Sequence, residues 1–291
     1  MVATTTLANA VISGALLGIF YALVSSGFSM IWASMKLVNV AHAVLMFLAA
    51  YLTILVVNSY SVPWLVGLAV LVPLMFGVGA LVYRGILSYS YRTENFETVS
   101  LVATFGLAVA LENVLLYYFG PETQSANAGF GGIVEVAGLR LSTLRILGAV
   151  FALLATIALY YIIYRTSIGR SVRAAWQDQE VAMLYGVNPD RARVVMFGLA
   201  TALAGLAGVI LPAIRPITPA VHWEYIVIVF IVVIIGSVGS ITGTMLVGTG
   251  VGVIESTLPL FIPSSWVTVV LYVFLLAFLL YRPGGLFEGW A

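Results

Sequence analysis

The chain has 291 residues, of which 62% are hydrophobic and 8% are charged, with a formal net charge of +1. A soluble domain needs charge on its surface, so this composition excludes an ordinary soluble protein, and the small net charge does not indicate a nucleic-acid partner. The chain has no Cys, which excludes disulfides and Cys-ligated metal sites. Its only lysine, Lys36, follows no glycine-rich turn, so a Walker A nucleotide site is also excluded.

Long runs without Asp, Glu, Lys or Arg have the length that a bilayer core requires. We predict an all-α polytopic membrane protein with about eight or nine transmembrane or partly re-entrant helices in a single domain, residues 1–291. The expected segments are 8–33, 38–58, 63–83, 97–119, 146–164, 194–214, 223–239, 242–260 and 265–281.

Two places leave the number of full crossings open. A break is suspected within Lys36–Ala43, inside the first long apolar stretch. Only Ser240-Ile241 separates the seventh and eighth segments, which therefore form either a tight helical hairpin or a partial, re-entrant helix. Irregular backbone at membrane depth is tolerated only where protein or a water-lined cavity covers it.

The basic residues predict the orientation. Nine fall on one side of the predicted membrane: Lys36, Arg84, Arg92, Arg165, Arg170, Arg173, Arg191, Arg193 and Arg282. Three fall on the other: Arg140, Arg145 and Arg215. The positive-inside rule makes the first side, with the C-terminus, cytoplasmic. The side of the N-terminus stays open, because it depends on the doubtful segments.

Two connections are long enough to have structure of their own. The external loop 121–144 contains Ile133–Leu141, which predicts a small hairpin. In the cytoplasmic loop 165–193 we expect one amphipathic helix over Ser171–Tyr185, ended by Gly186, with Asn188-Pro189-Asp190 starting the next helix. The expected apolar face contains Val172, Ala175, Val181, Ala182 and Leu184. Such a crosswise helix suits either a docking site for a cytoplasmic partner or an amphipathic connector on the bilayer surface.

Four stretches, in order along the chain, resemble the LivH-type permease subunits of ATP-binding-cassette importers for branched-chain amino acids. The first is ALVSSGFSM at 22–30 with LVNVAH at 37–42. The second is SIGR at 167–170, followed by Arg173-Ala174-Ala175, Asp178, Ala182, Gly186 and Asn188. The third is GSVGSITG at 236–243, and the fourth is YRPGGLF at 281–287.

The resemblance implies half of a translocation pathway for branched-chain amino acids or a related small polar solute. It further implies a second, LivM-type permease, two cytoplasmic ATPases and an extracytoplasmic solute-binding protein, in a bacterial or archaeal plasma (inner) membrane. The chain departs from the family pattern at Ala43, Ser237 and Glu112, which leaves the solute open. A stand-alone secondary transporter or channel is the alternative, although no internal repeat is visible in the sequence.

Two groups of candidate residues follow. For the translocation pathway or gating we single out Glu112, which is ionisable within an apolar segment, and the suspected breaks at Asn39, His42, Gly239 and Ser240. Helix packing is the alternative role for the glycines, and a hydrogen-bonded structural role is the alternative for His42. For Glu112 the alternative is a protonated carboxyl that is hydrogen-bonded between helices. The resemblance adds a group for coupling to an ATPase: Arg173, Ala174, Ala175, Asp178 and Gly186.

No set of nucleophile, base and acid is present, and two histidines without cysteines do not indicate a metal site. We therefore expect a transport subunit with no catalytic residue, no metal and no cofactor, and place any ATP hydrolysis in a separate chain.

Overall fold

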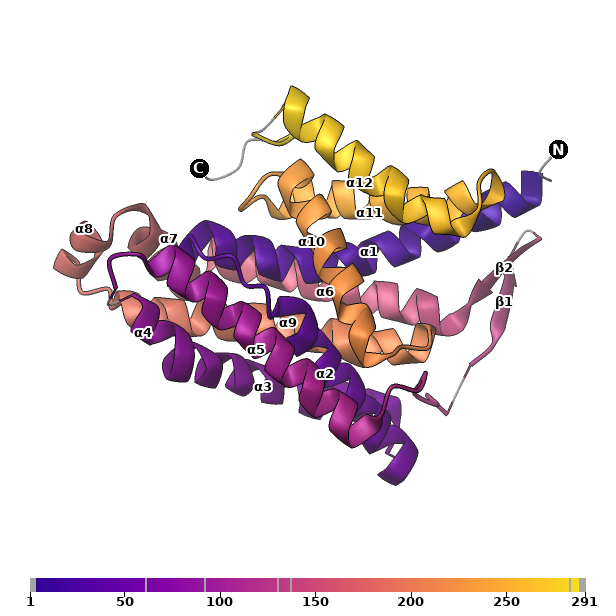
Figure 1. Ribbon diagram of the computed structural model, residues 1–291, viewed down its shortest axis with the longest axis horizontal. Helices are drawn as coiled ribbons and strands as arrows, with labels where there is room; N and C mark the ends of the chain where they lie inside the picture. The colour runs from indigo at the N-terminus through magenta and orange to yellow at the C-terminus, as the bar shows by residue number, and fades with distance from the viewer. Residues whose placement is uncertain are drawn as a thin grey trace.

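A computed structural model describes residues 4–60, 62–91, 93–129, 131–136, 138–282 and 284–287. Within them, nine helices or helix pairs are long and apolar enough to cross a membrane, which confirms the all-α polytopic prediction (Figure 1). The first half comprises α1 (Thr4–Met35), α2 (His42–Ile54) with the π-turn η1 (Leu55–Ser59), α3 (Trp64–Val82) with the π-turn η2 (Tyr83–Leu87), α4 (Ser88–Ser90) and α5 (Phe96–Phe119). The second half comprises β1 (Ile133–Val136), β2 (Leu139–Ser142), α6 (Thr143–Arg165), α7 (Ser167–Gln177), α8 (Gln179–Leu184), α9 (Pro189–Ile214), η3 (Pro219–Val221), α10 (His222–Gly236), α11 (Ile241–Thr257), η4 (Leu258–Leu260) and α12 (Ser264–Tyr281).

Both suspected interruptions are present. Lys36 has a φ of 49° and ends α1, and helical structure resumes only at His42. Between α10 and α11, Ser237 and Gly239 both have positive φ, of 71° and 86°. The 15 residues of α10 rise about 22 Å at roughly 1.5 Å per residue, which is short of a bilayer core of about 30 Å.

The bundle has two distinct ends. One carries the strands β1 and β2 and is called the hairpin end; the other carries the short helices and is called the α7–α8 end (Figure 1). α1 begins at the hairpin end, where Asn9 Oδ1 accepts a hydrogen bond from the backbone N of Arg140 at 2.9 Å. Because α12 ends at the α7–α8 end, the two ends of the described chain lie on opposite sides of the bundle.

The prediction of a hairpin over 133–141 is confirmed, and the prediction of a single amphipathic helix over 171–185 is wrong. β1 and β2 pair antiparallel, with Ile133 opposite Ser142 and Glu135 opposite Arg140. The expected helix over 171–185 is two helices, α7 and α8, since Asp178 adopts an extended backbone (φ −153°, ψ 110°). Its carboxylate accepts hydrogen bonds from the backbone N–H groups of Glu180 and Val181, so it caps a new helix instead of continuing the old one.

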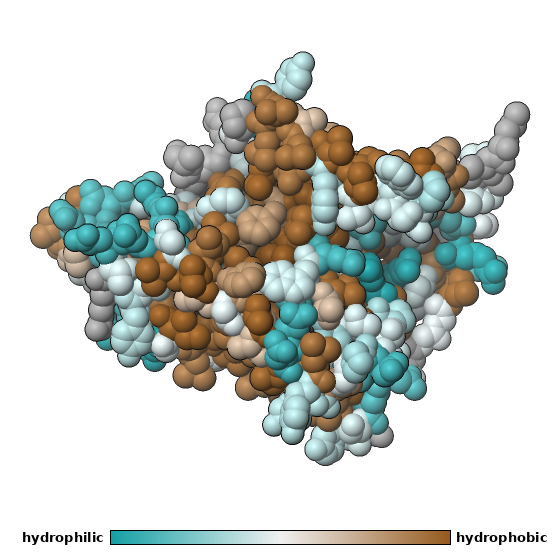
Figure 2. All heavy atoms as spheres, in the orientation of Figure 1, coloured by the Kyte–Doolittle hydropathy of each residue, from teal (hydrophilic) through white to brown (hydrophobic). Residues whose placement is uncertain are grey.

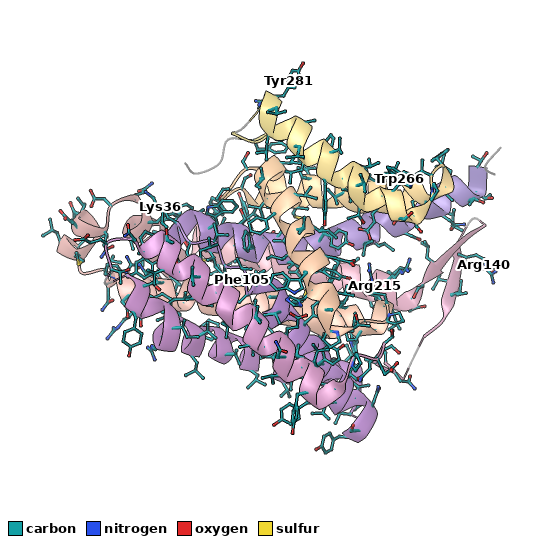
Figure 3. The ribbon with its side chains drawn as sticks, in the orientation of Figure 1. Lys36, Phe105, Arg140, Arg215, Trp266 and Tyr281 are labelled. Carbon is teal, nitrogen blue, oxygen red and sulfur yellow. The ribbon has the colours of Figure 1, made fainter. Side chains whose placement is uncertain are left out.

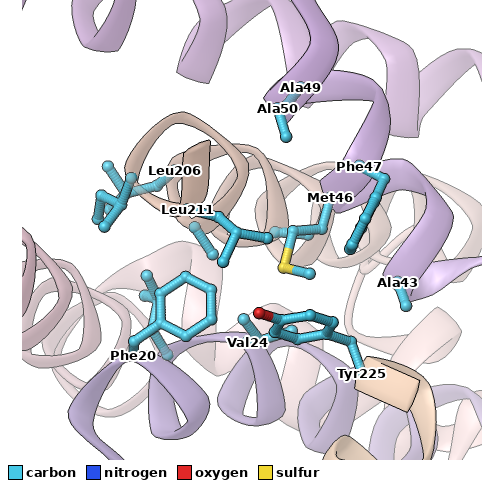
Figure 4. Packing of buried hydrophobic residues seen from close by; sticks show 14 of the residues in the cluster. Phe20, Val24, Ala43, Met46, Phe47, Ala49, Ala50, Leu206, Leu211 and Tyr225 are labelled. Carbon is cyan, nitrogen blue, oxygen red and sulfur yellow. The ribbon is translucent and has the colours of Figure 1, made fainter. Parts of the chain in front are cut away.

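The core lies where α1, α2, α9 and α10 meet (Figure 4). Phe20, Met46, Phe47 and Tyr225 interlock there, with the Phe47 and Tyr225 ring centroids 5.5 Å apart. α11 packs against α1 on the far side through glycines. A Cβ added to Gly252 would lie 2.3 Å from the backbone N of Gly18, so only glycine allows this approach.

α5, α10 and α12 form one face of the bundle, called the α10 face, and α10 lies between the other two helices (Figure 1). Apolar side chains cover much of the centre of this face, and hydrophilic ones gather at the α7–α8 end and toward the hairpin end (Figure 2). α12 is sparsely packed: among its described residues only Val267 and Leu271 are buried. Because α12 covers little of its neighbours, part of the surface of α10 is exposed on this face.

Candidate functional site

A polar cluster sits within the bundle near the hairpin end. Tyr21, near the middle of α1, donates from its hydroxyl to Glu255 Oε2 of α11 at 2.6 Å. The other carboxylate oxygen of Glu255 lies 3.7 Å from Nη1 of Arg215, the residue that follows α9. The guanidinium carbon of Arg215 also lies 5.4 Å from the centroid of the Tyr225 ring. Three elements thus bring opposite charges together at the edge of the apolar core.

A cavity of about 210 Å³ adjoins this cluster and is called the hairpin-end cavity. α10 contributes Glu224 and Ile228, and α12 contributes Val267, Thr268 and Leu271. Arg215 and Glu255 complete the polar wall, and Figure 3 shows Arg215 beside α10. The cavity therefore combines two carboxylates and one guanidinium with an aliphatic surface.

Glu112, a predicted pathway residue, is half-buried on α5 near the same end of α10. Its Oε2 accepts a hydrogen bond from Trp223 Nε1 at 3.0 Å. The Trp223 ring lies 5.7 Å from that of Phe105, so α5 and α10 meet through an aromatic contact as well. Glu112 is consequently an interhelical contact, and it does not line the hairpin-end cavity.

Asn39 and His42 are fully buried at the break between α1 and α2. His42 Nε2 is 3.1 Å from the carbonyl of Val24, and the carbonyl of Asn39 accepts from the backbone N of His42 at 3.1 Å. Thr104 of α5 bonds to the same break, at 3.3 Å from the carbonyl of Val38. Both predicted residues are therefore buried inside the bundle, where the His42 side chain bonds to α1 and the polar atoms of the Asn39 side chain have no hydrogen-bond partner in the described structure.

Gly239 and Ser240 lie in the turn between α10 and α11, at the α7–α8 end. The backbone N of Gly239 donates to Ser29 Oγ of α1 at 2.8 Å, and Ser240 Oγ caps α11 by accepting from the backbone N of Gly243 at 3.0 Å. The structure thus places both residues in a rigid, buried turn that is tied to α1.

The C-terminal motif closes onto this same turn. Ser237 Oγ accepts from the backbone N of Phe287 at 3.1 Å and also bonds to the carbonyls of Gly284 and Phe287. The backbone N of Leu286 donates to the carbonyl of Ile235 at 2.8 Å. Two sequence motifs about 50 residues apart are therefore in direct contact. No local sequence pattern predicts this contact.

A second cavity, of about 960 Å³, opens beside the turn and is called the α7–α8-end cavity. Its charged lining residues are Lys36 and Glu97, and its aromatic ones are Trp32 and Trp176. Val238 is the lining residue that comes from the turn between α10 and α11. One cavity with charged lining residues thus lies near each end of α10, and Figure 3 labels Lys36 at one and Arg215 at the other.

The predicted coupling residues build and attach the protruding pair α7 and α8. Arg173 bonds to the carbonyl of Ile163 and lies over the Tyr164 ring, with its guanidinium carbon 5.6 Å from the ring centroid. Ala174 and Ala175 are half-buried, and Ala175 faces a small crevice against α1 and α9. Asp178 caps the start of α8. Gly186 lies just beyond the end of α8 and has a φ of 78°.

The outer surface of this protrusion is formed by other residues. Leu184 is 86% exposed and Tyr185 is 84% exposed, and Val181 and Met183 are exposed beside them. Leu184 and Val181 were expected on one apolar face with Val172, Ala175 and Ala182; of these residues only Val172 and Ala182 are buried within the chain. The break at Asp178 changes the direction of the second half of the expected helix. Val181, Met183, Leu184 and Tyr185 consequently form an exposed apolar tip.

Sequence reasoning missed the pairing of Arg215 with Glu255. The signal was present, since each is a lone charge at the boundary of an apolar run, and the predicted topology puts both boundaries on one side of the membrane. Within the described ranges, no group of three His, Cys, Asp or Glu side chains is placed to hold a metal ion.

Comparison with known proteins identifies relatives along nearly the whole chain. Residues 10–279 match the family described as "Branched-chain amino acid transport system / permease component". The high-affinity branched-chain amino acid transport system permease protein LivH of Salmonella typhimurium is 25% identical, over 94% of this chain and 93% of its own. BraD of Pseudomonas aeruginosa, which bears the same description, is 24% identical over 94% of both chains. A probable LivH of Methanocaldococcus jannaschii is 25% identical over 91% of this chain and 87% of its own. No solved structure is significantly similar to this chain.

Proposed function

Since this chain belongs to the family of branched-chain amino acid permease components, we propose that it forms half of the translocation pathway of an ATP-driven importer. The match to the family over residues 10–279 carries this proposal. Its solute would be a branched-chain amino acid or a related small polar molecule. The named relatives are all components of transport systems, which does not favour the stand-alone transporter.

The proposed assembly has three kinds of partner. A second, LivM-type permease would complete the pathway, and two ATPases would bind at the α7–α8 end, on the cytoplasmic side of the plasma (inner) membrane. An extracytoplasmic binding protein would deliver solute at the hairpin end. The eight described basic residues of the predicted cytoplasmic set support this orientation, since they lie in the loops and helix ends of the α7–α8 side; Arg92 lies outside the described residues.

The α10 face is the proposed pathway surface. It lies between the hairpin-end cavity and the α7–α8-end cavity, and apolar side chains cover much of the surface between them. Asn39, His42, Gly239 and Ser240 would act on this pathway indirectly, by holding the break and the turn at the α7–α8 end. Glu112 would act by fixing α5 against α10 through Trp223.

The exposed tip of α8 is the proposed ATPase contact. Leu184 and Tyr185 project from a short helix whose direction is set by the Asp178 cap. The capping interaction contributes about 1 kcal/mol to starting this short helix at Asp178. Force from the ATPases would pass from this tip through α7 to α6, where Arg173 is bonded.

Purification of the native complex tests the assembly. Mild detergent extraction should recover an ATPase and a second permease with this chain, and proteoliposomes should take up leucine only with ATP and the binding protein. Uptake by this chain alone, without ATP, would refute the proposal.

A pair of variants tests the α8 contact. Asp178→Ala removes the cap and should uncouple ATP hydrolysis from uptake, whereas Asp178→Asn keeps a capping oxygen and should behave close to wild type. Leu184→Asp should weaken ATPase copurification, and Ile168→Asp, an equally apolar exposed position at the start of α7, is the matched control. Full ATPase binding by Leu184→Asp would exclude the tip as the contact.

A further inference from the structure

We propose that the hairpin-end cavity binds the zwitterionic head group of an aliphatic α-amino acid, with Arg215 holding its carboxylate and Glu224 its ammonium. The inference rests on the proposed function, because it assumes that the α10 face carries solute. It goes further in assigning direct solute recognition to this chain in addition to that of a binding protein.

The guanidinium of Arg215 has unused hydrogen-bonding capacity. It carries five N–H donors, and its distance of 3.7 Å to Glu255 Oε1 is an ion pair too long for a direct hydrogen bond. Glu255 is itself fixed from the other side by the Tyr21 hydroxyl. Arg215 also donates to that hydroxyl, which leaves other N–H donors of its guanidinium at the cavity that it lines, and a planar fork of this kind matches a carboxylate in bidentate fashion.

Glu224 supplies the opposite charge. It is exposed in the first turn of α10, lines the cavity, and makes no hydrogen bond or ion pair with any residue in the described part of the chain. Its carboxylate lies at the N-terminal end of α10, where the helix dipole favours a negative charge, so it needs no protein partner and is available to a ligand. An ammonium group between Glu224 and the cavity would be such a ligand group.

The rest of the wall suits an aliphatic side chain. Ile228, Val267 and Leu271 line the cavity, and the last two are the buried residues of α12. A cavity of about 210 Å³ is smaller than the usual pockets of about 300–1,000 Å³ for drug-sized ligands, which suits a single amino acid better than a larger solute. Because leucine and isoleucine are isomers and valine is one methylene shorter, we expect leucine and isoleucine to bind with similar affinity and valine to bind about tenfold or more weakly.

A purely structural ion pair explains less of this arrangement. It would account for Arg215 and Glu255, but it would leave Glu224 unpaired and the cavity unfilled. Three charges converging on one aliphatic cavity, two of them with bonding capacity to spare, match a ligand that carries both charges.

The absence of native cysteines gives a direct binding assay. Thr268→Cys places one thiol in the cavity, and Thr123→Cys places one on the exposed loop outside it. In the purified permease complex, L-leucine should slow the reaction of a water-soluble thiol reagent with Cys at 268 and leave the reaction at 123 unchanged.

Two analogues separate the charges. 4-Methylpentanoate lacks the ammonium and 3-methylbutylamine lacks the carboxylate, so each should protect at least about tenfold less well than leucine. Glu224→Gln, at an exposed position that folding does not require, should reduce protection by leucine to a similar degree. Arg215→Lys should bind more weakly than wild type and Arg215→Gln more weakly still.

The outcomes distinguish the site from the function. If the wild-type importer takes up leucine but leucine never protects position 268, even near its solubility limit, the site is refuted and the proposed function stands. Equal protection by leucine and either analogue would also refute recognition of the zwitterion. If the assembled importer takes up no branched-chain amino acid, the proposed function itself fails.

Discussion

α11 and α12 follow one another in the chain, but α11 is packed closely against another helix and α12 is not. α12 is the more apolar of the two, yet only 11% of its membrane-spanning window is buried in protein, against 39% for α11. α11 is glycine-rich, and its Gly248 and Gly252 lie against the backbone of α1. Inside a membrane, lipid satisfies an apolar side chain as well as protein does, so small residues rather than hydropathy decide which helix packs closely.

The two helices are also held in different ways. α11 is held along its length by close contact with α1, and hydrogen bonds such as Ser26 Oγ to Thr244 Oγ1, at 3.0 Å, add to that contact. α12 is held mainly at its ends, by Val267 and Leu271 on one side and by the 284–287 segment on Ser237 at the other. This difference can be tested with one substitution in each kind of contact.

The largest effect is expected for Gly252→Ala on α11. The new methyl group would lie 2.3–2.4 Å from backbone atoms of Gly14 and Gly18, which cannot move aside without separating the helices. We expect a loss of about 3 kcal/mol or more in the free energy of unfolding, measured by thermal or denaturant unfolding in detergent.

Gly250→Ala is the matched control on the same helix, because nothing lies within 4 Å of its added Cβ. It should be neutral or stabilise the protein by up to about 1 kcal/mol through higher helix propensity. Equal destabilisation by both substitutions would show that the α1–α11 contact is not as close as described.

An intermediate effect is expected at Ser237, which tethers the end of α12. Ser237→Ala removes the hydroxyl that bonds to Phe287, and should cost about 1–3 kcal/mol and raise hydrogen exchange in residues 284–287. Ser237→Gly loses the same bonds but relieves a φ of 71°, so it should be about 1 kcal/mol more stable than the alanine variant. If alanine were the more stable of the two, the backbone strain inferred here would be wrong.

The smallest effect is expected for Leu276→Ala on the exposed side of α12. Leu276 is 62% exposed in the described structure, so its truncation leaves no cavity within the chain. We expect a change below about 0.5 kcal/mol in the unfolding of the isolated subunit. Leu271→Ala, at one of the buried positions, should cost about 2–5 kcal/mol under the same conditions, and similar losses for both would contradict the sparse packing of α12.

Much of this fold could be predicted because bilayer physics acts locally. The charge-free runs located the nine described helices or helix pairs that are long and apolar enough to cross a membrane, and Lys36 and Ser240 marked both interruptions. The interface of α1 with α11 could not be predicted, because the glycines of α11 do not reveal which helix they meet. The break at Asp178 was also missed, since its capping role depends on which of two backbone conformations the whole loop adopts.

The candidate site was predicted less well than the fold. Glu112 was chosen as an ionisable group within an apolar segment, and it contacts Trp223 of another helix. Asn39 and His42 were chosen for a suspected helix break, and of their side chains only that of His42 bonds to another helix. Arg215 and Glu255 form the cavity wall because the ends of α9 and α11 converge, which is a property of tertiary structure. Polarity at membrane depth thus identifies residues that need a partner, and only the packing shows whether that partner is protein or solute.

The contact between Ser237 and residues 284–287 has a consequence for biosynthesis. Because a chain emerges from the ribosome in order, the α10–α11 turn is made and inserted before the segment that covers it. Ser237 can acquire these partners only after α12 has entered the bilayer and returned the chain to the same side. A nascent chain released before residue 284 would therefore have all of its crossings and still lack this closure, which would expose the unfinished turn to quality-control proteases.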